Sequence, residues 1–223
     1  MAGWPDPGLY EDASSPVWSL RPNLDRELPF EPEGGSFHVR TNSLGWRGDE
    51  PAQGALLCLG DSTTFGWGVE EDEAWPAQLQ ALLGAPVTNG GVPGYSTFQG
   101  LARMDAALAT KPSRVLLGFL VRDAELAPMA DAERPRSSAL PELFLVRAIR
   151  NSRTTDPAPP TDRGHPRVPP EQYRANLEAL IAQVEDAGAQ ALVLAFPMQE
   201  RPAAHLAALE GLPVLAPELP AEA

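Results

Sequence analysis

Three short, strongly apolar runs constrain the fold of this chain more than any other feature of its sequence. They cover residues 55–59, 115–121 and 189–196, and each has the length of one strand. Apolar runs of this length, stopped by small or polar residues, are typical of parallel strands buried on both faces. Segments with helical spacing of apolar residues lie between and before them, at 75–83, 98–110 and 171–187. This alternation predicts an α/β fold, a three-layer α/β/α sandwich with a parallel sheet.

The rest of the chain divides at about residue 54. Residues 1–54 are rich in Pro and Gly and predict an extended arm with one or two short strands, packed on a domain formed by residues 55–223. Within that domain we expect a short second strand at 86–89 and helices at 140–150 and 202–209.

Composition excludes several classes of partner. The chain has 223 residues, the size of one domain, and its formal net charge is −13 with a pI near 4.6. Nucleic acid and anionic membranes are bound through clustered Lys and Arg, so neither is an expected partner.

The single Cys58 allows no internal disulfide and no cysteine metal cluster, and we expect no metal and no organic cofactor. Without a signal-peptide pattern or a long apolar run, the expected location is the cytoplasm. Nothing in the sequence indicates the oligomeric state.

In parallel α/β sheets, ligands bind outside the carboxyl ends of the strands. After the first strand comes Gly60-Asp61-Ser62, which places a serine where a base can activate it and where backbone N–H groups can face an oxyanion. Thr64 stands where the α/β-hydrolase elbow has its second glycine, so that motif is excluded. The simpler interpretation is that Ser62 only caps a turn.

The next strand ends lead into two further segments. After the second strand, the sequence Asn89-Gly90-Gly91-Val92-Pro93-Gly94-Tyr95-Ser96-Thr97 is rich in exposed N–H donors, although it is also a plausible simple turn. The third strand ends in Val121-Arg122-Asp123.

Together these blocks resemble the SGNH/GDSL hydrolases, a group of serine esterases and acyl transferases with a flavodoxin-like α/β/α fold. The resemblance rests on Gly60-Asp61-Ser62, on Asn89-x-Gly-x-x-Gly94-x-x-Thr97, and on the buried strand ending in Asp123. Two flanking segments extend it: Arg40-Thr41-Asn42-Ser43-Leu44-Gly45-Trp46-Arg47-Gly48 is similar to a lead-in of many bacterial members, and Tyr173-Arg174-x-Asn176-Leu177 is similar to the segment before their last helix and strand.

The resemblance implies roles for individual residues. Ser62, beside its motif neighbour Asp61, would be the nucleophile, and the backbone N–H groups of Ser62 and Gly94 would form two sides of the oxyanion hole. In the family a third donor is an Asn side chain just before the Asp that matches Asp123. Here that position is Arg122, whose guanidinium either replaces the donor, or instead points to solvent or pairs with Asp123.

The catalytic base is the largest departure from the family pattern. The family has Asp-x-x-His after the last strand, and we find no such block, so the domain is expected to be incomplete at its C-terminal side. Asp162-Arg163-Gly164-His165-Pro166 matches by type and spacing but precedes the last helix and strand. His165 is thus a candidate base, and Asp162 is the carboxylate that would orient it. The alternative interpretation is that the match arises by chance in a Pro-rich loop. His205, in a helix of alanines and leucines, and His38, in the arm, fit the role less well.

Two functions remain open. The first is hydrolysis of acyl or acetyl esters, on a carbohydrate or a lipid, through an acyl-enzyme on Ser62. The second is a non-catalytic domain of the same fold that binds an acylated carbohydrate or a protein. A nucleotide-binding domain is disfavoured because no Gly-x-Gly-x-x-Gly follows the first strand. Trp67, beside Ser62, could stack on a sugar or anchor the arm.

Overall fold

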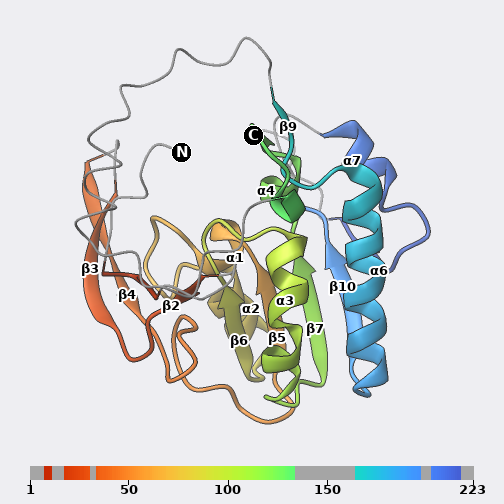
Figure 1. The fold of residues 1–223 in the computed structure, drawn as a ribbon. Coiled ribbons are helices and arrows are strands. Elements are labelled where there is room, and N and C mark those ends of the chain that lie inside the picture. Colours follow the sequence, from red (N-terminus) through yellow and green to blue (C-terminus); the bar gives the residue numbers. More distant parts are fainter. Residues whose placement is uncertain (1–7, 12–17, 31–33, 134–163, 197–201, 217–223) are drawn as a thin grey trace, which may run out of the picture.

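The computed structural model describes residues 8–11, 18–30, 34–133, 164–196 and 202–216. Its centre is a sheet of five parallel strands in the order β11-β10-β7-β5-β6 (Figure 1). The strands are β5 (Leu56–Gly60), β6 (Val87–Gly91), β7 (Arg114–Gly118), β10 (Gln190–Leu194) and β11 (Val214–Leu215). The parallel sheet expected from the apolar runs is confirmed. The helix expected at 140–150 lies outside the described residues.

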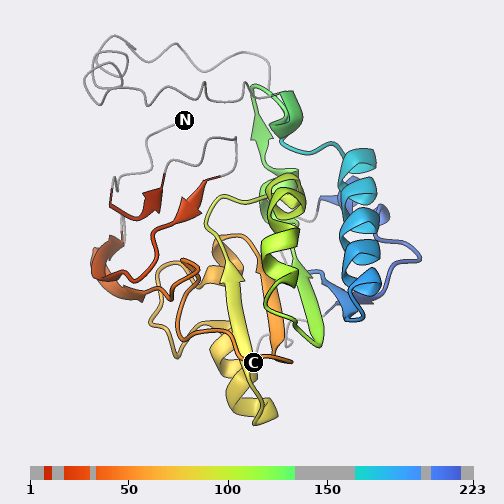
Figure 2. The same cartoon turned by 60° about the horizontal axis from the view of Figure 1, so that its bottom comes forward.

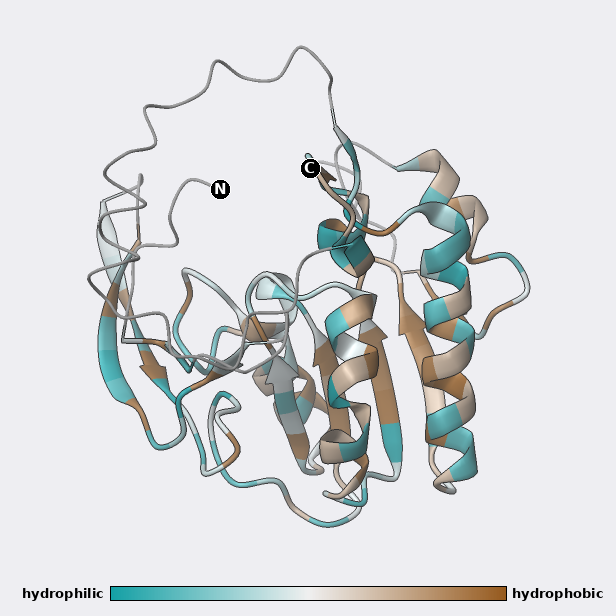
Figure 3. Ribbon diagram, in the orientation of Figure 1, coloured by the Kyte–Doolittle hydropathy of each residue, from teal (hydrophilic) through white to brown (hydrophobic). Residues whose placement is uncertain are grey.

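The central strand β5 is apolar because it is covered on both faces and both edges. It pairs with β6 on one side and β7 on the other, from Leu56 to Gly60. Leu57 and Cys58 are almost completely buried, and burial raises the pKa of the Cys58 thiol. In Figure 3 the hydrophobic colour is concentrated on the strands of this sheet.

Helices cover the sheet on both faces. Helices α3 (Thr97–Leu108) and α6 (Pro170–Asp186) pack against each other on one face, while α2 (Trp75–Leu83) packs against β6 behind the sheet in Figure 1. The apolar stripe predicted for α6 is buried as expected. Its buried members are Tyr173, Leu177, Leu180, Ile181 and Val184. Helix α7 (Ala203–Ala207) is shorter than predicted. In the described part of the chain, no helix is both long and apolar enough to cross a membrane.

The arm contains more strands than the one or two predicted. Strand β1 (Tyr10–Glu11) pairs with β2 (Ser19–Leu20), and β3 (Asp25–Phe30) forms an antiparallel hairpin with β4 (Gly35–Arg40). In the hairpin, buried side chains alternate with exposed ones, which is the pattern of strands with one face on a core. The buried members join the apolar core of the sheet domain, at the β6 edge (Figures 1 and 2). The boundary at residue 54 stays a prediction.

Candidate active site

Ser62 lies at the carboxyl end of the central strand. It is the first residue of the short helix α1 (Ser62–Phe65), which follows β5 directly. The buried Asp61 is the N-cap of this helix, and its Oδ1 accepts a hydrogen bond of 2.8 Å from the Thr63 N–H. Burial raises the pKa of the Asp61 carboxyl, and the bond from Thr63 together with the charge of Arg122 opposes that rise.

Glycine in β6 lets α1 pack tightly over the strand ends. A Cβ on Gly91 would lie 2.3 Å from the Phe65 backbone nitrogen, closer than any real contact. Asn89, two residues earlier, accepts a bond from the Gly91 N–H and donates one of 3.2 Å to the Phe65 carbonyl. The residues of the second motif thus fix the position of the helix that carries Ser62.

Among the residues that the structure describes, Arg122 is the side chain with a polar contact to the Ser62 hydroxyl. Its Nη2 donates a long hydrogen bond of 3.5 Å to the Ser62 Oγ. Its Nη1 forms an ion pair with the Oε2 of Glu125, at 3.1 Å. The predicted strand 115–121 ends earlier, at Gly118, and Arg122 belongs to the short helix α4 (Val121–Ala124). An apolar run does not distinguish a strand from a buried helix end, which explains the difference. Within the described part of the chain, the carboxylate that pairs with Arg122 is that of Glu125, and the expected alternative of pairing with Asp123 is not observed.

Asp123 instead points into the interior and joins two sequence motifs. It is fully buried and accepts hydrogen bonds from the N–H and the Oγ1 of Thr97. The Thr97 hydroxyl in turn accepts a bond of 2.9 Å from Asn176 on α6. Burial is the main cause that raises the pKa of Asp123 to about 7. The sequence picked out Asp123, Thr97 and Asn176 separately, and the structure brings them together.

The loop after β6 carries Gly94 and is fixed by contacts from the arm. Gly94 has a φ of +87°, a conformation that favours glycine. The Val92 N–H donates to the Gly60 carbonyl, which holds the loop at the end of β5. The Trp18 Nε1 donates a hydrogen bond of 3.2 Å to the Pro93 carbonyl. The Tyr95 hydroxyl donates a hydrogen bond to the Trp18 carbonyl. The oxyanion role of Gly94 stays a prediction.

No histidine among the described residues forms a hydrogen bond with Ser62. His165 is exposed in strand β9 (His165–Pro166), which pairs antiparallel with β8 (Leu126–Ala127), rather than in a loop as expected. Asp162 lies outside the described residues. His205 is buried, with Nε2 2.8 Å from the Val168 carbonyl, and His38 is 2.7 Å from Asp25 on the arm hairpin.

A chain of charged side chains connects Arg122 with the start of α3. Glu125 lies between Arg122 and Arg167, at 3.1 and 3.5 Å. The guanidinium of the buried Arg167 donates through two nitrogens to Asp131, at 2.8 and 3.1 Å. Asp131 also accepts a hydrogen bond of 2.7 Å from the hydroxyl of Ser96, which is the N-cap of α3. Sequence reasoning missed this network, because no local pattern connects positions so far apart.

Comparison with known proteins identifies the family of this chain. The model of the GDSL-like lipase/acylhydrolase family matches residues 58–214, which is more than half of the chain. The chain belongs to this family. A comparison with curated protein sequences found no match.

Several solved structures of the GDSL and SGNH class are similar to this GDSL-family chain. TesA is 22% identical with a TM-score of 0.44, over 65% of this chain and 61% of TesA. The SGNH-hydrolase family esterase AlinE4 is 18% identical with a TM-score of 0.41, and the match covers 67% of this chain and 61% of AlinE4. The psychrotrophic esterase EstA from Pseudoalteromonas sp. is 16% identical with a TM-score of 0.46, and the match covers 74% of this chain and 77% of EstA. The match thus spans about three fifths of TesA and AlinE4.

One buried arginine of this GDSL-family chain has a role that the sequence did not reveal. Arg47, in the lead-in motif, donates hydrogen bonds to the carbonyls of Phe65, Gly66, Val69 and His38. It also lies over the rings of Phe37 and Phe65. Burial lowers the pKa of its guanidinium, and the charges of Glu71 and Glu70 oppose that shift. Its place in the motif Asn-Ser-x-Gly-aromatic-Arg-Gly was the only signal in the sequence.

Trp67 contacts the arm as well. Its ring lies edge-on to Phe37, with centroids 5.2 Å apart, and is tilted against Phe65 at 6.2 Å. These contacts favour the interpretation of Trp67 as an anchor of the arm. Among the residues that the structure describes, no cluster of His, Cys, Asp or Glu is arranged to hold a metal ion.

Proposed function

We propose that this chain hydrolyses carboxylic esters through an acyl-enzyme intermediate, with Ser62 as the nucleophile. The observation that carries the proposal is the contact between the Ser62 Oγ and the Arg122 guanidinium, 3.5 Å apart, at the carboxyl ends of the central strands. Membership of the GDSL-like lipase/acylhydrolase family supports an ester as the substrate. The acyl or acetyl group and the alcohol to which it is attached, a carbohydrate or a lipid, belong to the same proposal.

In the first half of the reaction, the Ser62 Oγ attacks the carbonyl carbon and its proton passes to a base. The carbonyl oxygen becomes an oxyanion, and the backbone N–H groups of Ser62 and Gly94 donate to it. The C–O bond to the alcohol then breaks, the alcohol leaves with the proton, and the acyl group stays on Ser62. In the second half, water attacks the acyl group, releases the acid and restores the hydroxyl.

Arg122 supplies the third oxyanion donor in this proposal. Its Nη2 is already next to the nucleophile, and its Nη1 is held by Glu125, so the guanidinium has little freedom to turn away. A guanidinium stays charged at any pH at which the enzyme works, and it forms stronger hydrogen bonds to an oxyanion than a neutral amide. The Arg at the family's Asn position is therefore a functional replacement.

His165 is the proposed base. Its strand β9 runs alongside the segment that follows α4, because the Val168 N–H donates to the Asp123 carbonyl and the Arg167 N–H to the Glu125 carbonyl. In Figure 1, β9, which contains His165, and α1, which begins at Ser62, lie at the same end of the sheet, and this supports the proposal. The partner carboxylate in the proposal is Asp162.

A second candidate is a non-catalytic domain that binds an acylated carbohydrate or a protein. The observation that favours it is the absence of a hydrogen bond between Ser62 and any of the described histidines.

Hydrolysis of p-nitrophenyl acetate separates the two functions. We expect the wild-type chain to turn over the ester and Ser62→Ala to lose that activity. The variant Ser36→Ala removes an exposed hydroxyl from β4 and is the matched control. The variant Arg122→Ala is expected to lower kcat by about 10²- to 10³-fold, which is the loss typically seen when one oxyanion donor is removed. No turnover by the wild type, or equal rates for wild type and Ser62→Ala, would reject the esterase and favour the binding domain.

His165→Ala then tests the base. We expect its rate to fall by at least about 10³-fold at neutral pH, because the nucleophile loses its proton acceptor. An unchanged rate in an active wild type would remove His165 from the mechanism while leaving Ser62 in place.

A further inference from the structure

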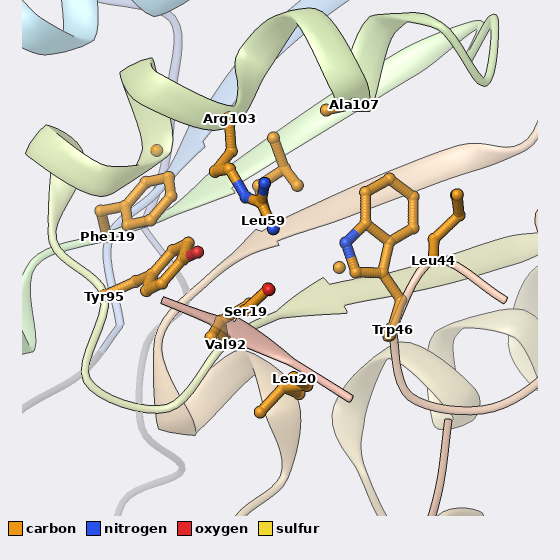
Figure 4. A pocket seen from close by; sticks show the side chains of 13 residues that line it. Ser19, Leu20, Leu44, Trp46, Leu59, Val92, Tyr95, Arg103, Ala107 and Phe119 are labelled. Carbon is orange, nitrogen blue, oxygen red and sulfur yellow. The ribbon is translucent and has the colours of Figure 1, made fainter. Parts of the chain in front are cut away.

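A small cavity lies between the arm and the sheet domain, apart from Ser62 and Arg122 (Figure 4). The arm forms one wall through β2 and the loop of the lead-in motif. Strands β5 and β6, the loop after β6 and helix α3 form the other walls. The space open to water-sized molecules is about 30 Å³. One water needs about 10–15 Å³ on this scale, so the enclosed space takes about two or three heavy atoms, and the charged end of a four-atom ligand such as acetate would lie at the opening, beside the exposed Arg103.

The polar groups that line the cavity are predominantly donors. Figure 4 shows the Arg103 guanidinium, the Trp46 indole nitrogen and the Ser19 hydroxyl directed toward the same space. Within the described contacts, neither Trp46 Nε1 nor Ser19 Oγ has a hydrogen-bond partner. A guanidinium and an indole N–H donate and never accept, and a hydroxyl can donate. These groups together match a ligand that accepts several hydrogen bonds.

The charge around the cavity has one sign. Arg103 is the ionisable cation of the lining, and none of the lining residues is acidic, in a chain with 30 acidic residues against 17 basic ones. Arg103 also interacts with the hydroxyl of Tyr95 and opposes the burial that raises the pKa of Tyr95 to about 12. An anion is therefore favoured over a neutral or cationic ligand.

The floor of the cavity is apolar. Leu59 of β5, Val92 and Phe119 line it, and Gly90 lines it without a side chain. A bare inorganic anion would lose its hydration against these side chains without compensation. An anion with a small apolar end would place that end on the floor and keep its charge beside Arg103.

We infer that the cavity is a binding site for a small carboxylate of the size of acetate, with its methyl group on the apolar floor and its oxygens on Arg103, Trp46 and Ser19. A planar carboxylate accepts two parallel bonds from a guanidinium, which a point-charge anion such as chloride does not. Val92 and Tyr95 line the cavity on either side of Gly94, so the ligand contacts the loop that bears the proposed oxyanion donor. The binding itself does not depend on ester hydrolysis.

Nuclear magnetic resonance of the indole N–H groups tests this inference. The chain has five Trp residues, and a Trp46→Phe variant assigns the Trp46 signal. We expect sodium acetate to shift that signal with saturation in the millimolar range, and sodium chloride at equal ionic strength to leave it in place. Trp75 packs against Phe196, away from the cavity, and its signal is the internal control.

Arg103→Gln should weaken acetate binding by at least about tenfold, because the ligand loses its charged donor. Arg103 is exposed on α3, so the variant is expected to fold, and a dispersed spectrum confirms that it has. The matched control is Arg114→Gln, an exposed arginine at the far end of β7, which should bind as the wild type does. A Trp46 signal that stays still throughout the acetate titration, or equal titration by Arg103→Gln and wild type, would overturn the inference.

Discussion

The buried Asp123 carboxyl gives the stability of this chain a specific dependence on pH. In the folded chain its pKa is raised to about 7, from an ordinary value of 3.8. Between these values the unfolded chain has released this proton and the folded chain still holds it. Stability therefore falls as pH rises, by about 1.4 kcal/mol per pH unit. Over about three units, Asp123 lowers the free energy of unfolding by about 4 kcal/mol.

Asp123→Asn removes this titration and keeps the shape of the side chain. Urea unfolding of both chains, followed by circular dichroism from pH 4 to pH 8, measures the difference in the free energy of unfolding at each pH. We expect the wild type to lose stability relative to Asp123→Asn as pH rises through this range, and the difference to become constant above about pH 7. Asp105→Asn, on the exposed face of α3, is the control for a carboxyl without burial. A difference that stays constant, or that changes in the opposite direction, would refute the linkage.

Three further substitutions test the contacts around α1 and α3. Arg47→Met removes one donor from each of four carbonyls and should cost about 3–5 kcal/mol in urea unfolding, whereas a cost below about 1 kcal/mol would contradict its anchoring role. Gly91→Ala forces a methyl group against the backbone of α1 and should cost about 1–3 kcal/mol and slow ester hydrolysis, while Gly35→Ala, with open space around it, should change neither. Ser96→Ala removes the α3 cap and a bond to Asp131, and thermal unfolding should show a loss of about 1–2 kcal/mol; an unchanged Tm would show that the cap is dispensable.

The sheet could be predicted because buried parallel strands must be apolar and short. The runs at 55–59 and 189–196 become β5 and β10 with shifts of one or two residues at their ends. The run at 115–121 was predicted too long, because Phe119 and Leu120 are buried beyond the strand and carry the same apolar signal. The arm gave a weaker signal, since its strands alternate over only a few buried positions.

The site was predictable where a local motif determines it. Asp61 and Ser62 follow β5 as the sequence indicated, and Asn89 and Thr97 lie on the neighbouring segments. The contact between Ser62 and Arg122 depends on a short helix after β7, and no periodicity encodes it. The partners of Arg47 are backbone carbonyls, which any sequence supplies, so its role was visible only in three dimensions.

The central claim is that Ser62 is the reactive nucleophile, and the site of covalent labelling by a fluorophosphonate tests it most directly. The reagent forms a bond to an activated serine oxygen, and peptide mass spectrometry identifies that serine. We predict one adduct, on the peptide that contains Ser62, which is lost in Ser62→Ala and retained in Ser36→Ala. No adduct on the wild-type chain, or an adduct on another serine that survives in Ser62→Ala, would contradict the account.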